Sequence, residues 1–517
     1  MKKLYSVVGL AFCLLACGCT NLHEEILNEQ DNSQVITDPN NAKMLAAPAY
    51  ASMRDFMGTG DLFALTETST DECVFPSRGS DWNDVNNRTL FWHTYDATNE
   101  HVKNGWNVLM STLTRSNVAI NYLSELEQTE EVKGYINEVK FIRALSMYYL
   151  MDYWGHFPMR ESDATDFSAL PQILDRPAAL ERIISELNEI IPNLKQKGEV
   201  PYGRITKAAA QTLLAHIYLN YQVFTGTAPE FTDGQAEWDK VIDLCTEIIN
   251  SGKYKFSDDY WKLYLSDNSA EADATEAILP FVYDQSLGVS GQSWLNVTLH
   301  YSQNFGHYSF WNGCCTTPTF LDTWDKTDPR YTDSRLKSQI GFNIGMIEGQ
   351  QYSISGEALK DRKDNPLIYT PDFKVDGASE TEGVRVLKYA PDPNYAYGSG
   401  SDNDVMFYKY SDIYLMRGEA RFRKGDVEGA LQDINTVRAA RGVKEYTAQT
   451  LTLESFYNER GYELYWDGMS RRDDMVRFNK YCGARYNVEA CDKHFILFPI
   501  PQSALEANGE LKQNEGY

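Results

Sequence analysis

Apolar residues recur every three to four positions over long stretches of the chain, which is the period of a helix that buries one face. The segments that follow this period are 46–57, 102–127, 132–153, 177–194, 205–224, 238–251, 411–424, 427–441 and 453–467. Two short runs, 276–283 and 384–389, have a strand-like pattern instead. The chain is therefore predicted to be mainly α-helical.

Turn-forming residues separate the predicted helices. Gly425 precedes Asp426, which places a residue suited to a helix end directly before a residue suited to an N-cap. Gly252 ends another predicted helix in the same way. Small residues such as Gly418 and Ala420 allow helices to approach closely. These features indicate a scaffold of tetratricopeptide-like helical repeats, although the 34-residue period is degenerate and a generic helical bundle is the alternative.

Residues 60–100 and 265–408 lack the helical period and are rich in Gly, Asn, Asp, Ser, Thr and aromatic residues. Long irregular segments inside a compact protein usually carry function. We expect one domain over residues 20–517, with helical halves at about 40–260 and 409–517. Between them lies an irregular insertion at about 265–408, and the long insertions carry the binding loops.

The N-terminus is typical of an exported protein. Lys2 and Lys3 precede an apolar run at residues 4–16, followed by Cys17 and Cys19. This is the layout of a secretory signal, and the run is too short to span a bilayer. The residues before Cys17 resemble a bacterial lipobox, and a competing frame ends at Cys19. Both cysteines are candidates for lipidation, and acyl chains on either one would anchor the protein to a membrane.

The net charge argues against two classes of binding partner, and the cysteine content argues against a disulfide-stabilised fold. There are 48 Lys and Arg against 73 Asp and Glu, a net charge of −25, which argues against nucleic acid and against anionic lipid surfaces. Nine cysteines are too few for a disulfide framework. Cys314 and Cys315 are expected to be free, whereas Cys482 and Cys491 either pair or remain free. No His or Cys cluster has zinc spacing, and the Asp-rich residues 322–328 match no EF-hand, so no metal or cofactor is predicted.

Catalytic motifs are missing from the sequence. It contains no G-x-S-x-G, no H-E-x-x-H and no Gly-rich phosphate loop, and its eight histidines are scattered. A glycosidase would need two carboxylates flanking one bond, and no segment singles out such a pair. The chain is therefore predicted not to be an enzyme. Its aromatic content of 13%, with 33 Tyr and 10 Trp, suits sugars and wet interfaces better.

Several longer motifs resemble those of one family in their order along the chain. They are FIRALSMYYL at 141–150, YWGHFP at 153–158, GRITKAAA at 203–210, YKYSDIYLMRGEA at 408–420, INTVRAARG at 434–442, ERGYEL at 459–464, DGMSRRDDMVRF at 467–478, FPIP at 498–501 and QNEGY at 513–517. Together they resemble the RagB/SusD family over nearly the whole mature chain. Arg417-Gly418 and Met469 are small departures from its pattern.

The resemblance implies an outer-membrane lipoprotein with a tetratricopeptide-like scaffold. It would bind glycans at the cell surface as a lid on a SusC-like TonB-dependent transporter and deliver nutrient into it. A mature chain beginning at Cys19 looks more like the family than one beginning at Cys17. The alternatives are a peptide or glycopeptide receptor, a glycan hydrolase, and a transporter lid without its own binding site.

The charged residues in these motifs have a structural interpretation. We expect the arginines of the motifs to be buried or half-buried members of ion pairs rather than ligand contacts, with three acidic residues among their partners. The arginines are Arg143, Arg204, Arg438 and Arg477, and the acidic residues are Glu459, Glu463 and Asp474.

The first binding candidate is the loop at residues 67–106. Trp82 lies among polar, turn-forming residues where a core Trp would be out of place. An indole face packs on a pyranose ring, and neighbouring polar groups satisfy the sugar hydroxyls. Because family members place glycan-stacking aromatics in the corresponding loop, the resemblance assigns this role to Trp82, with Arg78, Asp81 and Asn83 as polar partners. Trp92, His93 and Tyr95 are weaker candidates, and Trp106 is expected to be structural.

The second candidate is the aromatic stretch at 294–312, in the long insertion. Trp311 and Tyr308 are the strongest choices, followed by Trp294 and Asn312. The alternative is a satellite hydrophobic cluster beneath the loop. We expect the two segments to converge on one face and form a shallow aromatic platform for an oligosaccharide.

Overall fold

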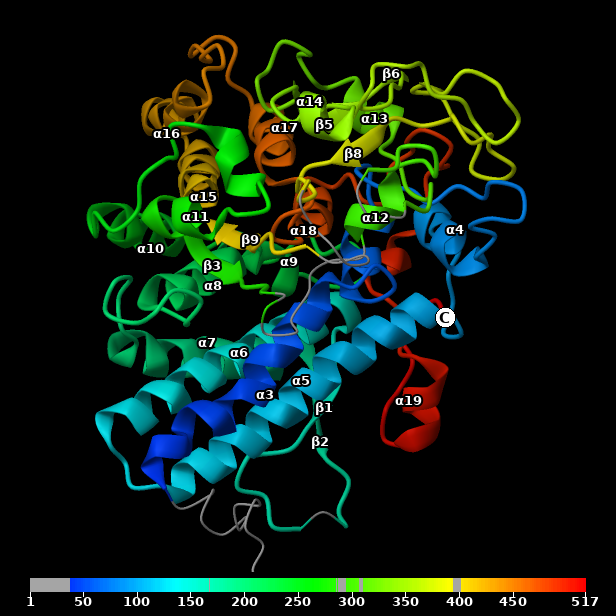
Figure 1. Cartoon of the computed structure of the whole chain (residues 1–517). Helices are drawn as coiled ribbons and strands as arrows, with labels where there is room; N and C mark the ends of the chain where they lie inside the picture. Colours follow the sequence, from blue (N-terminus) through cyan, green and yellow to red (C-terminus); the bar gives the residue numbers. More distant parts are fainter. Residues whose placement is uncertain (1–37, 167, 285, 287–293, 306–309, 394–400) are drawn as a thin grey trace, which may run out of the picture.

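The computed structural model describes residues 38–517 except 167, 285, 287–293, 306–309 and 394–400. The candidate lipidation residues Cys17 and Cys19 lie outside this part of the chain. The described chain is mainly helical, which confirms the predicted fold class, and its strands are short and few. Figure 1 shows the long N-terminal helices stacked along one end of the molecule and the irregular segments at the other.

The N-terminal half is a layer of long helices that lie side by side (Figure 1). Helix α5 packs on α3 and α6, α6 packs on α7, and α8 packs on α10. Their bounds are α3 (Ala42–Arg54), α5 (Glu100–Glu125), α6 (Glu130–Trp154), α7 (Arg176–Ile190), α8 (Lys207–Leu219), α9 (Tyr221–Phe224) and α10 (Trp238–Asn250). The short strands β1 (Phe157–Met159) and β2 (Gln172–Leu174) pair between α6 and α7.

The C-terminal half continues the same kind of packing. Helix α15 packs on α10, α16 and α17, and α17 packs on α18. Their bounds are α15 (Tyr410–Arg423), α16 (Val427–Ala440), α17 (Leu453–Leu464), α18 (Arg471–Arg477) and α19 (Gln502–Ala507). Between α15 and α16, Gly425 has φ +89° and the Asp426 side chain accepts the Gly429 N–H at 2.9 Å. The turn chemistry predicted there is confirmed.

One strand pair brackets the insertion. Strand β3 (Ala277–Phe281) pairs antiparallel with β9 (Val405–Lys409), and α15 begins directly after β9. The intervening chain therefore leaves the helical body at β3 and returns to it at β9. Within it, β4 (Thr332–Asp333), β5 (Ile344–Ile347) and β8 (Arg385–Leu387) form one sheet, and β6 (Gly349–Gln350) pairs with β7 (Ile368–Tyr369). Its short helices are α12 (Trp294–Thr298), α13 (Pro318–Leu321) and α14 (Lys337–Ile340), and α11 (Ser269–Ala274) precedes β3.

The first irregular segment lies against this insertion. It contains the π-helical turn η3 (Ala64–Thr68) and helix α4 (Val85–Trp92), whose N-cap is Asp84. The backbones of Val74 and Cys315 form an antiparallel bridge, with N–H to carbonyl distances of 2.9 Å in both directions. Segments more than 200 residues apart along the chain therefore share one end of the molecule.

The predicted ion pairs are present in the helical halves. All four motif arginines contact carboxylates, and Glu459 and Asp474 are among their partners. The pairs are Arg143–Glu186 at 2.9 Å, Arg204–Glu138 at 2.6 Å, Arg438–Glu459 at 2.5 Å and Arg477–Asp474 at 2.6 Å. The third acidic residue, Glu463, pairs with other basic residues, among them Arg330 and Arg441.

Candidate functional site

Trp82 and Trp311 lie side by side where the two irregular segments meet. The indole Nε1 of Trp82 donates a hydrogen bond to the main-chain carbonyl of Trp311 at 2.6 Å. The Trp82 ring also packs on Phe75, with ring centroids 5.2 Å apart, and over Gly313. A Cβ at Gly313 would come within 2.6 Å of the indole, so this close approach requires glycine. The expected convergence of the two segments at these residues is confirmed.

The two indoles differ in exposure. Trp311 is 37% exposed and is among the few large apolar side chains at the surface of the described residues. Trp82 is half-buried, and Asn83 beside it is exposed. Tyr308 and the side chain of Trp294, at the start of α12, lie outside the described residues. The face that the described residues offer to a ligand is therefore one open indole with the edge of a second.

Arg78 and Asn312 lie beneath this face. Arg78 is buried, and its guanidinium donates to the carbonyls of Gly313, Ser379 and Glu382. Burial, together with the neighbouring Arg385 cation, lowers the pKa of Arg78 to about 9.

Asn312 is fully buried and has φ +52°. Its Nδ2 donates to the Glu380 carbonyl at 3.2 Å, and its Oδ1 accepts from Arg385 at 2.8 Å. The polar groups of Arg78 and Asn312 thus form hydrogen bonds that join the segments 78–82, 311–313 and 379–385.

Asp81 is the surface member of the set. Its carboxylate accepts hydrogen bonds from the Tyr301 hydroxyl at 2.8 Å and from the Arg362 guanidinium at 2.5 Å. These hydrogen bonds, with that from Arg362 the stronger, lower the pKa of Asp81 below its usual value. Arg362 also stacks on the Tyr301 ring, 4.3 Å from the ring centroid. Burial and the Asp81 carboxylate raise the pKa of Tyr301 to about 12, so its hydroxyl stays protonated as a donor.

Glu380 extends this chain of hydrogen bonds. It accepts from Arg362 Nε at 2.5 Å and from His300 Nε2 at 2.9 Å. His300 Nδ1 accepts the Ser302 N–H at 3.0 Å, so Nε2 carries the proton. Burial alone would raise the pKa of Glu380, but the hydrogen bonds from the Arg362 backbone and from His300 lower it overall. The result is a continuous row of polar groups beside the two indoles.

Sequence reasoning missed two members of this row. Arg362 lies just before β7, and Glu380 lies between β7 and β8. Both belong to polar segments without a recognisable motif, so no local signal marks them. His300 and Tyr301 belong to the aromatic stretch that sequence reasoning did single out. Of the weaker candidates, His93 and Tyr95 are buried and Trp92 is half-buried. Trp106, which was expected to be structural, is buried as well.

The larger cavities lie elsewhere. One of about 970 Å³ opens among α7, α8 and α9 and is lined by Arg176, Tyr218 and Tyr221. Another of about 690 Å³ lies along α5 beside Asn117 and Tyr122. Neither cavity is lined by Trp82 or Trp311. The exposed Trp311 indole instead suits an extended chain that keeps part of its own hydration.

None of the helices that the structure describes between residues 38 and 517 combines the length and the apolar character that crossing a bilayer requires.

Two family models match the chain. A model described as "SusD family" matches residues 275–517, and one described as "Starch-binding associating with outer membrane" matches residues 26–219. Between them they cover most of the sequence, including the whole of both candidate segments.

Curated and solved proteins give the same picture. The starch-binding protein SusD of Bacteroides thetaiotaomicron is 26% identical over 501 residues, covering 88% of this chain and 85% of that protein. A SusD superfamily protein of Parabacteroides distasonis aligns with a TM-score of 0.71 and 21% identity, over 94% of this chain and 100% of its own. Surface glycan-binding protein A of Bacteroides thetaiotaomicron, solved with laminarihexaose, aligns with a TM-score of 0.69 and 18% identity, over 92% and 99%.

Proposed function

The chain belongs to the SusD/RagB family, and on that premise we propose that it is a glycan-binding lipoprotein of the outer membrane. It holds oligosaccharides at the cell surface and passes them to a SusC-like TonB-dependent transporter. In this proposal residues 1–19 are the lipoprotein signal, Cys19 or Cys17 carries the lipid, and residues 20–517 form one domain. The family consists of binding proteins rather than enzymes, so binding proceeds without turnover.

The observation that carries the glycan proposal is the juxtaposition of Trp82 and Trp311 with the polar row. A pyranose ring presents apolar C–H faces and a rim of hydroxyls, so a sugar site needs a flat aromatic surface and hydrogen-bonding groups within one ring's reach. Trp311 supplies an exposed indole, and a hydrogen bond fixes the Trp82 indole to the main chain of Trp311. Arg362 and Asp81 supply a charged donor and a charged acceptor, which form the stronger hydrogen bonds.

The buried residues have a supporting role in the proposal. Arg78 and Asn312 join the three loop segments beneath the face and hold the indoles in place. A platform that is rigid before binding loses less entropy when the ligand arrives. Tyr308, Trp294 and Asn83 remain predicted ligand contacts that enlarge the platform.

The test is retention of the protein by glycans. The full chain in detergent is run through native gels containing starch or laminarin, the classes named for relatives, and soluble oligosaccharides are then titrated by calorimetry. Trp311→Ala should weaken binding about tenfold or more, because burying a large apolar side chain is worth about 1.5–3 kcal/mol. Tyr122→Ala is the matched control, since Tyr122 is also an exposed aromatic but lies on α5.

The outcomes separate the alternatives. Equal retention of Trp311→Ala and wild type on every retained glycan would reject this face as the site. Reducing ends released from the polysaccharide would indicate a hydrolase, and binding of peptides alone would indicate the peptide receptor. A lid without a site would co-purify with a transporter barrel yet bind neither.

The anchor and partner have separate tests. Replacing both Cys17 and Cys19 should abolish lipid labelling and release the protein from the membrane fraction. Mild detergent extraction of the wild type should recover a transporter barrel with it, and failure to recover one would count against the proposed delivery step.

A further inference from the structure

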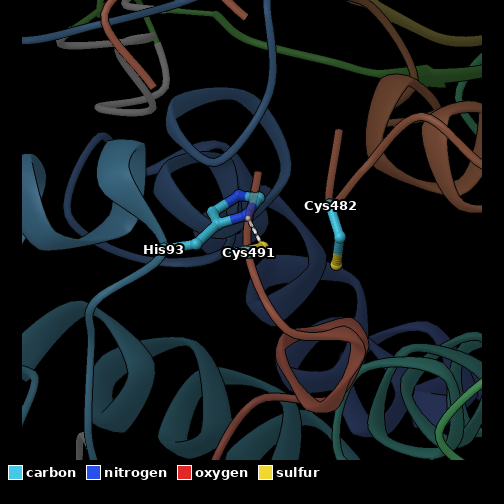
Figure 2. A group of neighbouring side chains, drawn as sticks. All are labelled: His93, Cys482 and Cys491. Carbon is cyan, nitrogen blue, oxygen red and sulfur yellow. Dashed lines mark hydrogen bonds between the residues drawn. The ribbon is translucent and has the colours of Figure 1, made fainter. Parts of the chain in front are cut away.

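Three side chains with metal-binding atoms come together beside helix α4. His93, Cys482 and Cys491 place one ring nitrogen and two sulfurs all within 4.8 Å of one another. Figure 2 shows the His93 ring directed at the Cys491 sulfur, with the Cys482 side chain beside them. The distance from His93 Nδ1 to Cys491 Sγ is 3.2 Å. The cluster joins chain positions 398 residues apart, so no zinc-type spacing along the sequence indicates it.

Hydrogen bonding fixes which nitrogen of His93 faces the sulfurs. The other ring nitrogen, Nε2, lies 2.8 Å from the Ser69 carbonyl, which only accepts, so Nε2 carries the proton. Nδ1 therefore presents its lone pair to the cysteines. Metal-binding histidines are held in this way, with the second N–H donated to a carbonyl or carboxylate.

Packing fixes the orientation of the His93 ring. Its centroid lies 4.4 Å from that of Tyr481 and 6.2 Å from that of Phe495, with the Phe495 ring stacked on it. His93 is the C-cap of α4 and has φ +52°, a left-handed conformation in which His, like Asn and Asp, is enriched among residues other than Gly. The imidazole is 1% exposed, so the ligand atom is pre-positioned rather than free to turn away.

The two cysteines are set by one closed loop. The Cys491 N–H donates to the Cys482 carbonyl at 3.0 Å, and Arg485 and Val488 form an antiparallel bridge inside the loop. Both cysteines are half-buried, so an ion has access to them from solvent. The remaining cysteines that the structure describes, including Cys314 and Cys315, are free and fully buried.

A cation lies beside the cluster. The Arg485 guanidinium donates to the carbonyls of Ser69 and Phe91. It lies 3.3 Å from His93 Nε2 because both groups donate to the same Ser69 oxygen. A neighbouring cation stabilises a thiolate over a thiol. Two thiolates also neutralise a divalent ion, so the occupied site would carry no net charge of its own next to this half-buried arginine.

We propose that His93 Nδ1, Cys482 Sγ and Cys491 Sγ form a zinc site whose fourth position is open to water. Sulfur and imidazole ligands are those that Zn²⁺ prefers in tetrahedral sites. Bond lengths of about 2.3 Å to sulfur and 2.0–2.1 Å to nitrogen place a nitrogen and a sulfur ligand roughly 3.5 Å apart. The observed 3.2 Å therefore needs only a small opening. Each ion bound displaces two thiol protons to solvent, and no electron is transferred.

A disulfide is the competing use of the same residues. It would join the two sulfurs and leave the His93 lone pair facing no donor, whereas a zinc ion engages all three oriented atoms.

The site also has a mechanical consequence. It ties the C-terminal end of α4 to the loop at 482–491, and the N-terminal end of α4 follows Trp82 by three residues. Zinc would thus stabilise the helix that continues from the aromatic face.

The test uses Co²⁺ as a spectroscopic probe for Zn²⁺ on the full chain in detergent, reduced and freed of metal. One equivalent of Co²⁺ should give thiolate-to-cobalt charge-transfer absorption and the visible bands of tetrahedral cobalt, and Zn²⁺ should abolish both by displacing Co²⁺. Cys482→Ser and Cys491→Ser should each lose the charge-transfer absorption or weaken metal binding at least about tenfold, and His93→Ala should do the same. Cys245→Ser, a buried cysteine on α10, is the matched control and should bind as wild type does.

A second readout covers variants that fold poorly. Zn²⁺ should raise the melting temperature of the wild type and of Cys245→Ser, and should leave the Cys482→Ser/Cys491→Ser double variant unchanged. The proposal is overturned if the reduced wild type, with both thiols shown to be free, gives no charge-transfer absorption. It is equally overturned if the double variant keeps the absorption, or if Zn²⁺ raises its melting temperature as much as that of the wild type.

Discussion

The helical half and the aromatic face each contain a network of arginines and carboxylates, but the two networks differ in burial. Around α17, Glu463 lies 2.7 Å from Arg441, 2.9 Å from Arg330 and 3.0 Å from Lys409, and all four side chains are 0–1% exposed. On the aromatic face, Arg362 lies 2.5 Å from both Asp81 and Glu380, and the Arg362 side chain is 50% exposed.

The contrast shows that contact distance alone does not reveal what an ion pair does. In the buried network, loss of one partner strands a charge away from water, so the members act as a unit. This unit ties α17 to β9 through Lys409 and to the insertion through Arg330. Exposed pairs contribute little to folding because water competes for them. Their donors and acceptors remain available to a ligand, which is what a polar row beside two indoles requires.

The largest expected effect is on the buried network. Glu463→Gln removes the charge that faces Arg441, Arg330 and Lys409, and should lower the free energy of unfolding by about 3–5 kcal/mol. Urea unfolding followed by circular dichroism measures this loss. Glu357→Gln is the control, because Glu357 is exposed in the insertion, and it should change stability by less than about 0.5 kcal/mol. Equal effects of the two substitutions would show that burial does not distinguish the networks.

The second prediction concerns two neighbouring carboxyl groups that are fully buried, Glu67 and Glu72. Burial raises the pKa of Glu67, in η3, to about 7, and it also raises the pKa of its neighbour Glu72. Because the folded-state pKa of Glu67 is above the unfolded value of about 4.3, the folded protein binds the proton more tightly. Its contribution is present below pH 4.3 and is lost as the pH rises towards 7, at up to about 1.4 kcal/mol per pH unit.

Glu67→Gln should therefore flatten this decline. Unfolding free energies of wild type and variant, measured at intervals between pH 4 and 8, should diverge in favour of the variant by about 1–3 kcal/mol at the upper end. Glu357→Gln should follow the wild-type profile throughout. A Glu67→Gln profile parallel to that of the wild type would show that this carboxyl is ionised in the folded protein across the range.

The helical half was largely predictable from sequence, because its period, caps and motif arginines are local signals. The predicted long helices differ from the structure mainly near their ends, as where the predicted helix 205–224 is interrupted at Asn220, with φ −97° and ψ 7°. Helices α4 and α18 were missed because each is about two turns long. Strand β9 was missed because it forms by pairing with β3, and neither segment alone contains a sequence signal for that pairing.

The aromatic face was predictable only in part. Trp82 and Trp311 stand out because large aromatics in polar loops are locally unusual. Arg362 and Glu380 do not stand out, since their role depends on how the chain around β7 folds back onto Asp81. Arg78 was expected at the surface with its neighbours, yet it lies buried, because the carbonyls that it binds come from two distant segments. The cluster of His93 and the two cysteines is likewise a property of the fold.

The smallest effect on stability, and the sharpest test of the comparison, comes from Arg362. Arg362→Gln removes an exposed cation from Asp81 and Glu380 and should change the free energy of unfolding by less than about 1 kcal/mol. Glycan binding should nevertheless fall by about two- to tenfold, because one hydrogen bond contributes about 0.5–1.5 kcal/mol net. Calorimetry with the retained oligosaccharide and urea unfolding measure the two effects.

Arg335→Gln is the matched control for this last substitution. Arg335 is also a partly exposed arginine between two carboxylates, 2.7 Å from Asp259 and 2.9 Å from Asp333, but those partners lie outside the aromatic face. It should reproduce the small change in stability and leave glycan binding unaltered. If Arg362→Gln instead destabilised the fold as much as Glu463→Gln does, the exposed network would be structural. Its loss of binding would then report a collapsed face rather than a missing contact.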